Sequence, residues 1–353
     1  MQTDMHYYGT YAIACAAGIL PAASQAIATS AQYVDDSNVF EATLGDGLYI
    51  EAAATAHHPI DAENIHLVDQ CKIWVPFHFI PGNQGESLEE RLVCRMDSQL
   101  AREMVDHNLS YADSNFGLEL IGITAHVYAD TFSHYGFSGI SSPLNRVQAE
   151  SIQLNNVKDK NTLDYIMDKF VNFKDKYIAG RIADLVGLGH GSVGTYPDRP
   201  FLNWNFEYED GRNSGYRENK ETFLEACRQL HRIFTEFLAK RPELLGNNMQ
   251  RQFGEIEENI SAILATEGNM EDRIIAWQHA VVDGKVFGNP QKSPIPSYDK
   301  TNFDSDRELL STFNRDAVES TSIFQFLNAA KIHRDFVLNE LLPKYNLSVI
   351  YRM

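Results

Sequence analysis

The chain has 353 residues, a hydrophobic content of 44%, an aromatic content of 11% and a formal net charge of −18 at pH 7. These values are typical of a globular protein with a sizeable core. The negative charge argues against broad binding to nucleic-acid backbone or to an anionic membrane, since both favour Lys and Arg. A nuclease is not excluded, because a bound metal can supply local positive charge. Four widely spaced cysteines without a CxxC pair indicate buried thiols in a reducing compartment, and so a cytoplasmic protein.

The N-terminal region predicts two helices of small residues, at about 7–17 and 21–34. The apolar stretch 11–27 is similar to a secretion signal, but the chain opens MQTDMHYY without the Lys or Arg that such a signal needs. No run reaches the roughly 18 apolar residues required to cross a bilayer. We therefore expect a buried helical segment and no membrane span.

Acidic side chains and a histidine flank these two helices. Asp4 and His6 precede the first helix, and Asp35 and Asp36 follow the second. The helix dipole disfavours acids at a C-terminus, so the Asp pair costs some stability that a bound cation would offset. The ordinary alternative is a solvated helix end.

Residues 42–81 have a different pattern, with short β-branched and aromatic runs broken by Gly, Pro and Asn. This pattern predicts a β-hairpin or long loops packed on a helical body. His57 and His58 lie in it, and one or both imidazoles are expected to face inward. His66 and His78 are interpreted as polar surface, with a pocket lining as the alternative for His78.

The rest of the chain is predicted to be helical, which makes the fold class mainly α. A Ser-x-x-Glu capping box at Ser87 begins one helix. We expect one domain, 1–353, with a short hairpin insertion, and a C-terminal helical extension, 287–353, after a Pro-rich linker. The expected helices span 87–108, 115–137, 162–186, 216–239, 255–267, 270–286 and 304–342.

The stretch 122–139, GITAHVYADTFSHYGFSG, places His126, Asp130 and His134 at i, i+4 and i+8. Eight residues of helix advance roughly 800°, about 80° past two turns, so the three side chains share one stripe. Burying two imidazoles and a carboxylate on an apolar helix is costly unless a divalent cation such as Zn²⁺ binds them. The alternative is a polar face on which the Asp orients a His.

A second unusual stretch is the loop 187–205, GLGHGSVGTYPDRPFLNWN. Its glycines allow backbone conformations that close approach to a ligand can require. His190 and Asp198 are metal-ligand candidates, and Arg199 is suited to hold an anionic oxygen. A turn-rich connector is the alternative. His279 and Asp283 form another His-x3-Asp pair nearer the C-terminus.

The order of these residues resembles that in zinc-dependent phospholipase C and the single-strand-specific zinc nucleases, which are nearly all-helical. The resemblance covers the N-terminal two-fifths of the chain. It implies bound metal ions, most simply zinc, with Asp130 in the bridging place, and because of the departures given below we expect one or two ions and not a full cluster of three. The ligands implied by it are His6 with Asp4, Asp36 or Asp35, His57 or His58, His126, Asp130 and His134.

The chain more closely resembles an uncharacterised bacterial family with DMHYYGTYAIA, QYVDD, AHVYADTFSHYGFSG and GHGSVGTYPDRP as signatures. Three features depart from the phospholipase pattern. Only three residues separate Asp130 from His134, and the next His-acid pair is delayed, so His190 with Asp198, or His279 with Asp283, would have to replace it. Because Gln2 is too large for routine removal of Met1, no N-terminal Trp offers its amino group to a metal.

The functional hypothesis is a metal-dependent hydrolase that cleaves a phosphoester with a metal-activated water. Asp130 is the central catalytic residue, and Arg199 or Arg102 holds a phosphate oxygen. A small phosphorylated metabolite or nucleotide fits the charge better than a polynucleotide. The alternatives are a non-catalytic metal-stabilised protein, an HD-type phosphohydrolase, ranked lower because no His-Asp dipeptide occurs, and a metal-free helical interaction module.

Overall fold

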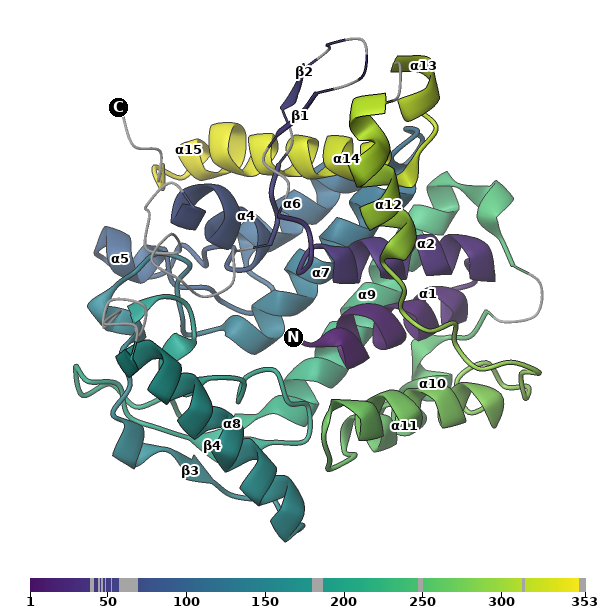
Figure 1. The fold of residues 1–353 in the computed structure, drawn as a ribbon. Coiled ribbons are helices and arrows are strands. Elements are labelled where there is room, and N and C mark those ends of the chain that lie inside the picture. The colour runs from purple at the N-terminus through teal and green to yellow at the C-terminus, as the bar shows by residue number, and fades with distance from the viewer. Residues whose placement is uncertain are drawn as a thin grey trace.

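The computed structural model describes residues 1–38, 41–43, 45, 47, 49–51, 53–56, 69–179, 187–246, 250–312 and 315–348. The described chain is predominantly helical, as the sequence predicted. Figure 1 shows the N-terminal helices in the middle of the molecule, with the C-terminal helices lying across one side of them.

The elements fall into a helical body and two small sheets. The π-helical segments are η1 (Asp4–Gly9), η3 (Gln70–Trp74) and η10 (Val337–Leu341), and the short 3-10 turns include η7 (Gly191–Val193). The α-helices are α1 (Thr10–Ala16), α2 (Pro21–Tyr33), α4 (Val75–Phe77), α5 (Leu88–Arg91), α6 (Gln99–Leu109), α7 (Gly117–His134), α8 (Lys160–Ala179), α9 (Asn219–Lys240), α10 (Phe253–Leu264), α11 (Met270–Val282), α12 (Thr301–Leu309), α13 (Arg315–Val318), α14 (Ser322–Phe336) and α15 (Leu342–Lys344). The strands are β1 (Glu41–Thr43), β2 (Tyr49–Glu51), β3 (Gln153–Leu154), β4 (Asn203–Asn205) and β5 (Arg217–Glu218).

Helix α7 is the centre of the body. All of its residues except Leu118 are buried, including the polar stripe of His126, Asp130 and His134. Helices α2, α6, α9 and α14 pack around it. The small residues of α2 permit the closest of these approaches. A Cβ built on Gly122 of α7 would lie 2.5 Å from the carbonyl oxygen of Ile27 on α2.

The predicted hairpin is confirmed at the start of the insertion. Strands β1 and β2 pair antiparallel, with Thr43 opposite Tyr49. Further along the insertion, η3 and α4 are helical, and the described residues 53–56 form no helix or strand. A second, antiparallel sheet has the order β3-β4-β5. It belongs to a smaller apolar cluster around Trp204, Phe206 and Phe137.

Two predicted helices are interrupted. The capping box at Ser87 is confirmed, but α5 ends at Arg91 and the chain restarts as α6 after Asp97, which has a positive φ of 46°. Ser98 caps α6 by accepting from the backbone N–H of Ala101. The predicted 304–342 helix is likewise divided into α12, α13 and α14, and Thr321 caps α14. Side-chain N-caps therefore begin new helices at points where apolar periodicity alone predicted one continuous helix.

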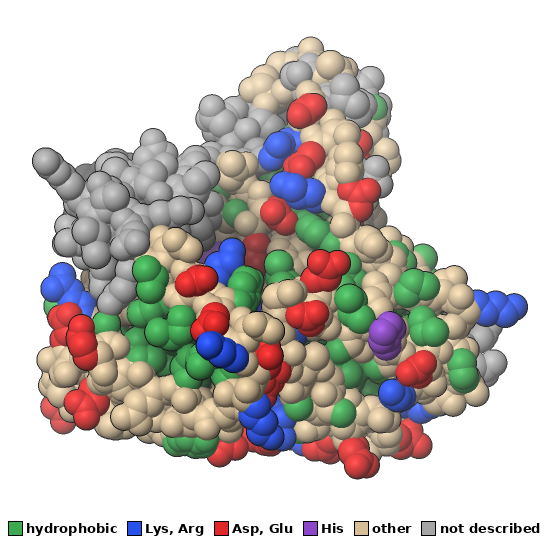
Figure 2. Space-filling view, turned by 60° about the horizontal axis from the view of Figure 1, so that its bottom comes forward, with side chains coloured by type: hydrophobic (Ala, Val, Ile, Leu, Met, Phe, Trp, Pro, Cys, Tyr) green, Lys and Arg blue, Asp and Glu red, His purple; other side chains and the backbone are tan. Residues whose placement is uncertain are grey.

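The C-terminal segments share the main core with the N-terminal ones. Buried Phe326, Leu327 and Ala330 of α14 belong to the same apolar cluster as Ile13 and Ile27. The four cysteines are buried and free, as predicted. No helix in the described ranges combines the length and apolar character needed to cross a membrane. On the face in Figure 2, acidic, basic and apolar side chains are interspersed.

Candidate metal centre

The stripe of α7 presents its three polar side chains to one buried region. His126, Asp130 and His134 are 0%, 1% and 5% exposed. Asp130 Oδ2 lies 3.2 Å from His126 Nε2 and 3.5 Å from His134 Nδ1. The predicted alignment of these residues on one helix face is therefore present in the fold.

Two further side chains meet this stripe at its His126 end. His78, just after α4, places Nδ1 3.2 Å from His126 Nε2 and 3.4 Å from Asp130 Oδ2. Asp35, just after α2, places Oδ1 3.8 Å from His126 Nε2 and 4.0 Å from His78 Nδ1. Four side chains from three parts of the chain thus converge on one point.

The outer hydrogen bonds of the two histidines determine what their inner nitrogens present. His126 Nδ1 is 2.8 Å from the carbonyl oxygen of Ala31, and His78 Nε2 is 2.9 Å from that of Thr55. A carbonyl only accepts, so both outer nitrogens carry the hydrogen, and each ring, in its neutral form, turns a lone pair inward. Two lone pairs 3.2 Å apart repel unless a proton or a metal ion lies between them.

A second donor group lies at the other end of the stripe. His134 Nε2 is 3.4 Å from Asp198 Oδ1, and His190 Nε2 is 3.8 Å from Asp198 Oδ2. The outer nitrogens are again engaged, since His134 Nδ1 bonds the carbonyl of His78 and His190 Nδ1 that of Gly194. As in the first group, the outer nitrogen of each ring bonds a backbone carbonyl and the inner nitrogen faces a carboxylate.

The first turn of the chain contacts both groups. The amino nitrogen of Met1 lies 2.6 Å from Asp130 Oδ1, 3.3 Å from Asp198 Oδ1 and 3.5 Å from His134 Nε2. His6 Nε2 lies 3.2 Å from Asp130 Oδ1 but outside hydrogen-bonding geometry. Neither ring nitrogen of His6 has a hydrogen-bond partner in the structure.

The charges of the centre are strongly coupled. Burial would raise the pKa of Asp130, but His134, the Met1 amino group and His126 outweigh it and hold that pKa well below its usual range. Burial would lower the pKa of the Met1 amino group, but Asp130 and Asp198 raise it to about 11. For His78, burial is outweighed by the hydrogen bond to Asp130 and the charge of Asp35, which raise its pKa. The centre therefore retains ionised carboxylates and attracts positive charge.

The spacing of the donors suits metal ions. Donors held 2.0–2.1 Å from a tetrahedral ion lie roughly 3.3 Å from one another. The closest inner contacts of His78, His126 and Asp130 are 3.2–3.4 Å, and Asp198 lies 3.4 Å from His134. The described residues form three candidate groups, and within each group the donor atoms lie within 4.8 Å of one another. The groups are His6–His126–Asp130, Asp35–His78–His126 and His134–His190–Asp198.

Two of these groups share His126, whose inner nitrogen has one lone pair and can bind one ion at a time. The third group shares no residue with the others. The described donors therefore offer two separate candidate positions for a metal ion, one at each end of the α7 stripe.

The other predicted ligands have different surroundings. Asp4 pairs with Arg273 Nε at 2.7 Å, and Asp36 accepts from the hydroxyl of Tyr298 at 2.7 Å. His57 and His58 lie outside the described residues. His279 and Asp283 are both exposed, away from the buried centre. Arg102 is exposed and paired with Asp97.

The interpretation of His78 as polar surface is wrong, because it is 7% exposed and part of the centre. Its apolar neighbours in WVPFHFIP were the available signal, since a buried imidazole in such a run needs a partner. Met1 was also missed, because the prediction looked for an N-terminal Trp and gave no role to the amino group of Met1.

The profile of a family described as a family of unknown function (DUF6765) matches residues 1–341. The chain belongs to the DUF6765 family. The predicted membership of an uncharacterised family is thereby confirmed. Comparisons with curated proteins and with solved structures gave no significant match. The matched range includes every donor residue of the candidate metal centre of this DUF6765 chain.

Proposed function

We propose that this protein is a metal-dependent hydrolase of small phosphoesters, with up to two divalent ions, most simply zinc, held at the two ends of the α7 stripe. The observation that carries the proposal is the 3.2 Å approach of the inner nitrogens of His78 and His126 beside the ionised carboxylate of Asp130, with both outer nitrogens bonded to backbone carbonyls. A cation between them turns a repulsion into coordination.

Asp130 is the residue placed to couple the two ends. Its Oδ2 faces His126 and His78, and its Oδ1 faces the Met1 amino group and His6. A carboxylate whose two oxygens face different neighbours is suited to bridge two ions, one of which would take the place of the Met1 amino group beside Oδ1. This supports the bridging role that the resemblance to zinc phospholipase C and the zinc nucleases implies.

A bound divalent ion lowers the pKa of its water from about 15.7 to about 7, which supplies the nucleophile for hydrolysis at neutral pH. The first group offers three close donors, and Asp35 beside them has a side chain 35% exposed. At the other end the side chain of His190 is 19% exposed. We therefore expect water and substrate to enter beside Asp35 at one end of the stripe and beside His190 at the other.

Arg199 supports the proposal that the substrate is an anion. It follows Asp198 in the chain, is 2% exposed, and its Nε and Nη1 have no hydrogen-bond partner in the structure. Its pKa is lowered by burial and by the nearby charge of Arg273, whose Nη1 is also without a partner. Buried guanidinium donors left open are costly, and phosphate oxygens would satisfy them.

The second candidate is a non-catalytic protein stabilised by the same ions. The near-complete burial of His126, Asp130 and His134 favours it, since structural sites are closed to water. Metal content alone does not separate the two candidates, but a hydrolysis assay does.

The test begins with elemental analysis of protein purified without added metal, beside a His126→Ala, Asp130→Ala double variant. We expect one or two equivalents of a divalent metal in the wild type and a loss of at least one in the variant.

Hydrolysis of p-nitrophenyl phosphate and bis-p-nitrophenyl phosphate is then measured with and without chelator. Hydrolysis abolished by chelation and restored by zinc supports the enzyme. Bound metal without hydrolysis of either ester supports the structural candidate. Metal retained in the double variant would contradict both.

A further inference from the structure

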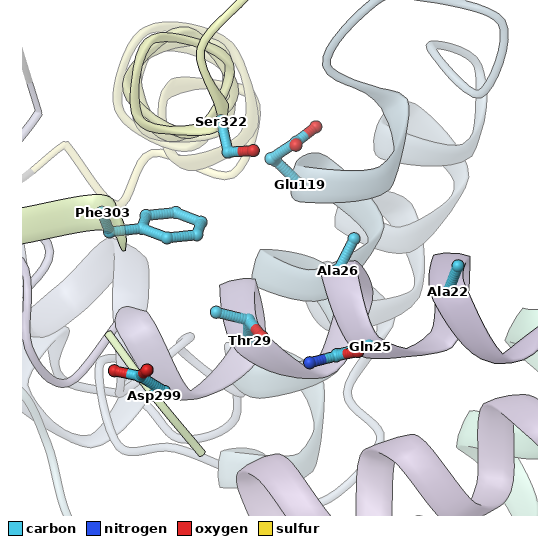
Figure 3. A pocket seen from close by; sticks show the side chains of 8 residues that line it. All are labelled: Ala22, Gln25, Ala26, Thr29, Glu119, Asp299, Phe303 and Ser322. Atoms are coloured by element: carbon cyan, nitrogen blue, oxygen red, sulfur yellow. The ribbon is translucent and has the colours of Figure 1, made fainter. Parts of the chain in front are cut away.

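A cavity of about 320 Å³ lies between α2, the start of α7 and the C-terminal segments (Figure 3). Glu119 of α7 lies eleven residues before Asp130, which is about 16 Å along a helix. The cavity is thus separate from the candidate metal centre. Its lining residues are Ala22, Gln25, Ala26, Thr29, Glu119, Asp299, Phe303 and Ser322.

Glu119 is the unusual member of this lining. It is 7% exposed, and its Oε2 has no hydrogen-bond partner in the structure. A buried carboxylate oxygen without a donor costs free energy, because water no longer solvates it. Glu119 lies in the first turn of α7, and no described group donates to its Oε2. Water or a ligand in the cavity would supply the missing donor.

The charge of the lining indicates the chemistry of that donor. The described lining has two carboxylates and includes no Lys, Arg or His. Glu119 is buried, whereas Asp299 is exposed and its Oδ1 accepts from the backbone N–H and the hydroxyl of Thr301. The neighbouring Lys300 is directed elsewhere, 3.7 Å from Asp36 and 3.4 Å from Asp304. A ligand that complements these carboxylates carries positive charge and hydrogen-bond donors.

The apolar part of the lining favours an organic cation over a metal ion. Phe303 presents an aromatic ring, and Ala22 and Ala26 present methyl groups from one face of α2. An aromatic ring attracts an ammonium group, and methyl groups contact an alkyl chain, whereas a hard metal ion requires a shell of oxygen ligands. Figure 3 shows Glu119 and Asp299 on opposite sides of the space that Phe303 borders. A short chain with an ammonium group at each end matches this arrangement.

We infer that this cavity is a binding site for a small organic ammonium compound, an alkylamine or short diamine, with Glu119 as its anionic anchor. One ammonium group donates to Glu119, the alkyl chain packs against Phe303, and a second ammonium group is placed toward Asp299. The site is distinct from the proposed hydrolase centre and does not depend on it.

The test is isothermal titration calorimetry at pH 8 of the full-length, metal-loaded protein with n-butylamine, 1,4-diaminobutane and, as the neutral control, n-butanol. We expect saturable binding of both amines at one site and no saturable binding of n-butanol. Glu119→Gln should weaken amine binding by about ten- to hundredfold, the range expected for a hydrogen bond to a charged group. Glu258→Gln, an exposed position on α10, is the matched control and should have no effect.

Two further variants keep the result interpretable. Asp299→Asn should remove the advantage of the diamine over the monoamine, and Ala26→Phe should block both by filling the cavity while leaving Glu119 in place. The inference is overturned if n-butanol binds as tightly as n-butylamine, if neither amine gives saturable binding, or if amine binding survives Glu119→Gln unchanged. Preferential binding of Ca²⁺ that Glu119→Gln removes would also overturn it in favour of a metal site.

Discussion

His126 and Asp130, one turn apart on α7, face each other across 3.2 Å between Nε2 and Oδ2 with both side chains fully buried. The same carboxylate has its second oxygen 2.6 Å from the Met1 amino nitrogen. The centre thus concentrates ionised carboxylates and inward imidazole lone pairs, an arrangement that a cation stabilises. Its stability should depend on bound metal.

Removing metal should lower the melting temperature. A ligand present at 100 times its Kd stabilises the folded state by about 2.7 kcal/mol, so chelation with EDTA should lower Tm by several degrees and added zinc should restore it. Differential scanning calorimetry measures the change. An equal Tm with and without chelator would contradict metal binding at the centre.

Adjacent aspartates should differ in their effect on metal affinity. Asp35→Asn removes a carboxylate 3.8 Å from His126 Nε2, whereas Asp36→Asn alters a side chain that bonds Tyr298. We expect the first variant to weaken zinc binding at least about tenfold and the second to leave it nearly unchanged. Competition with a chromophoric chelator gives both affinities. Equal losses in the two variants would place Asp35 outside the site.

Gly122 should be intolerant of a side chain because α2 and α7 approach closely there. A Cβ at this position would lie 2.5 Å from the carbonyl oxygen of Ile27 and 2.7 Å from the Cβ of Ser30. Gly122→Ala should therefore lower the free energy of unfolding by about 1–3 kcal/mol, measured by urea denaturation. Gly254→Ala is the matched control, because nothing lies within 4 Å of its Cβ position and the helical alanine should gain up to about 1 kcal/mol.

His333 should make the protein sensitive to acid. Its Nε2 donates to the carbonyl of Pro76 and its Nδ1 accepts from Asn108, an arrangement that requires the neutral ring. Burial lowers its pKa from 6.5 to about 4, and the charges of His107 and His126 act in the same direction. The unfolded chain therefore binds the proton more tightly. The corresponding stability is present above pH 6.5 and is lost as the pH falls toward 4, by about 3 kcal/mol.

Urea denaturation between pH 7 and pH 4 measures this loss. His333→Gln should be less stable at pH 7 but show a shallower decline on acidification, while His279→Gln, at an exposed position, should follow the wild type. A wild-type decline in both variants would show that His333 is not responsible.

Glu119 should have the opposite pH dependence. Burial raises its pKa from 4.5 to about 7. The folded state then binds the proton more tightly than the unfolded chain, so stability falls as the pH rises from about 4.5 to 7 and stays low above that. Glu119→Gln should remove this fall, which urea denaturation at pH 5 and pH 8 can detect. A variant that retains the full fall would contradict the burial argument.

The sequence alone predicted the features that depend on local pattern. The mainly α fold, the capping box at Ser87 and the hairpin after residue 41 follow from periodicity and turn residues, and the fold contains all three. The stripe of His126, Asp130 and His134 also follows from helical geometry. These features need no knowledge of what packs against them.

Other features depended on which segments meet in space. Asp35 was separable from Asp36 only once Tyr298, from the far end of the chain, was seen to bond Asp36. The apolar sequence neighbours of His78 are compatible with a surface pocket and with the core. The structure places His78 in the centre, where its outer nitrogen Nε2 bonds the carbonyl of Thr55.

The sequence by itself determined the helical elements and the side chains of α7 that share one face, because these follow from spacing along the backbone. Only the tertiary structure decided that Met1, His6, Asp35, His78, His190 and Asp198 surround that face. The physical reason is that a donor set is defined by distances between atoms far apart in the chain. The packing of α2, α4 and the 187–205 loop around α7 sets those distances, and no local pattern contains them.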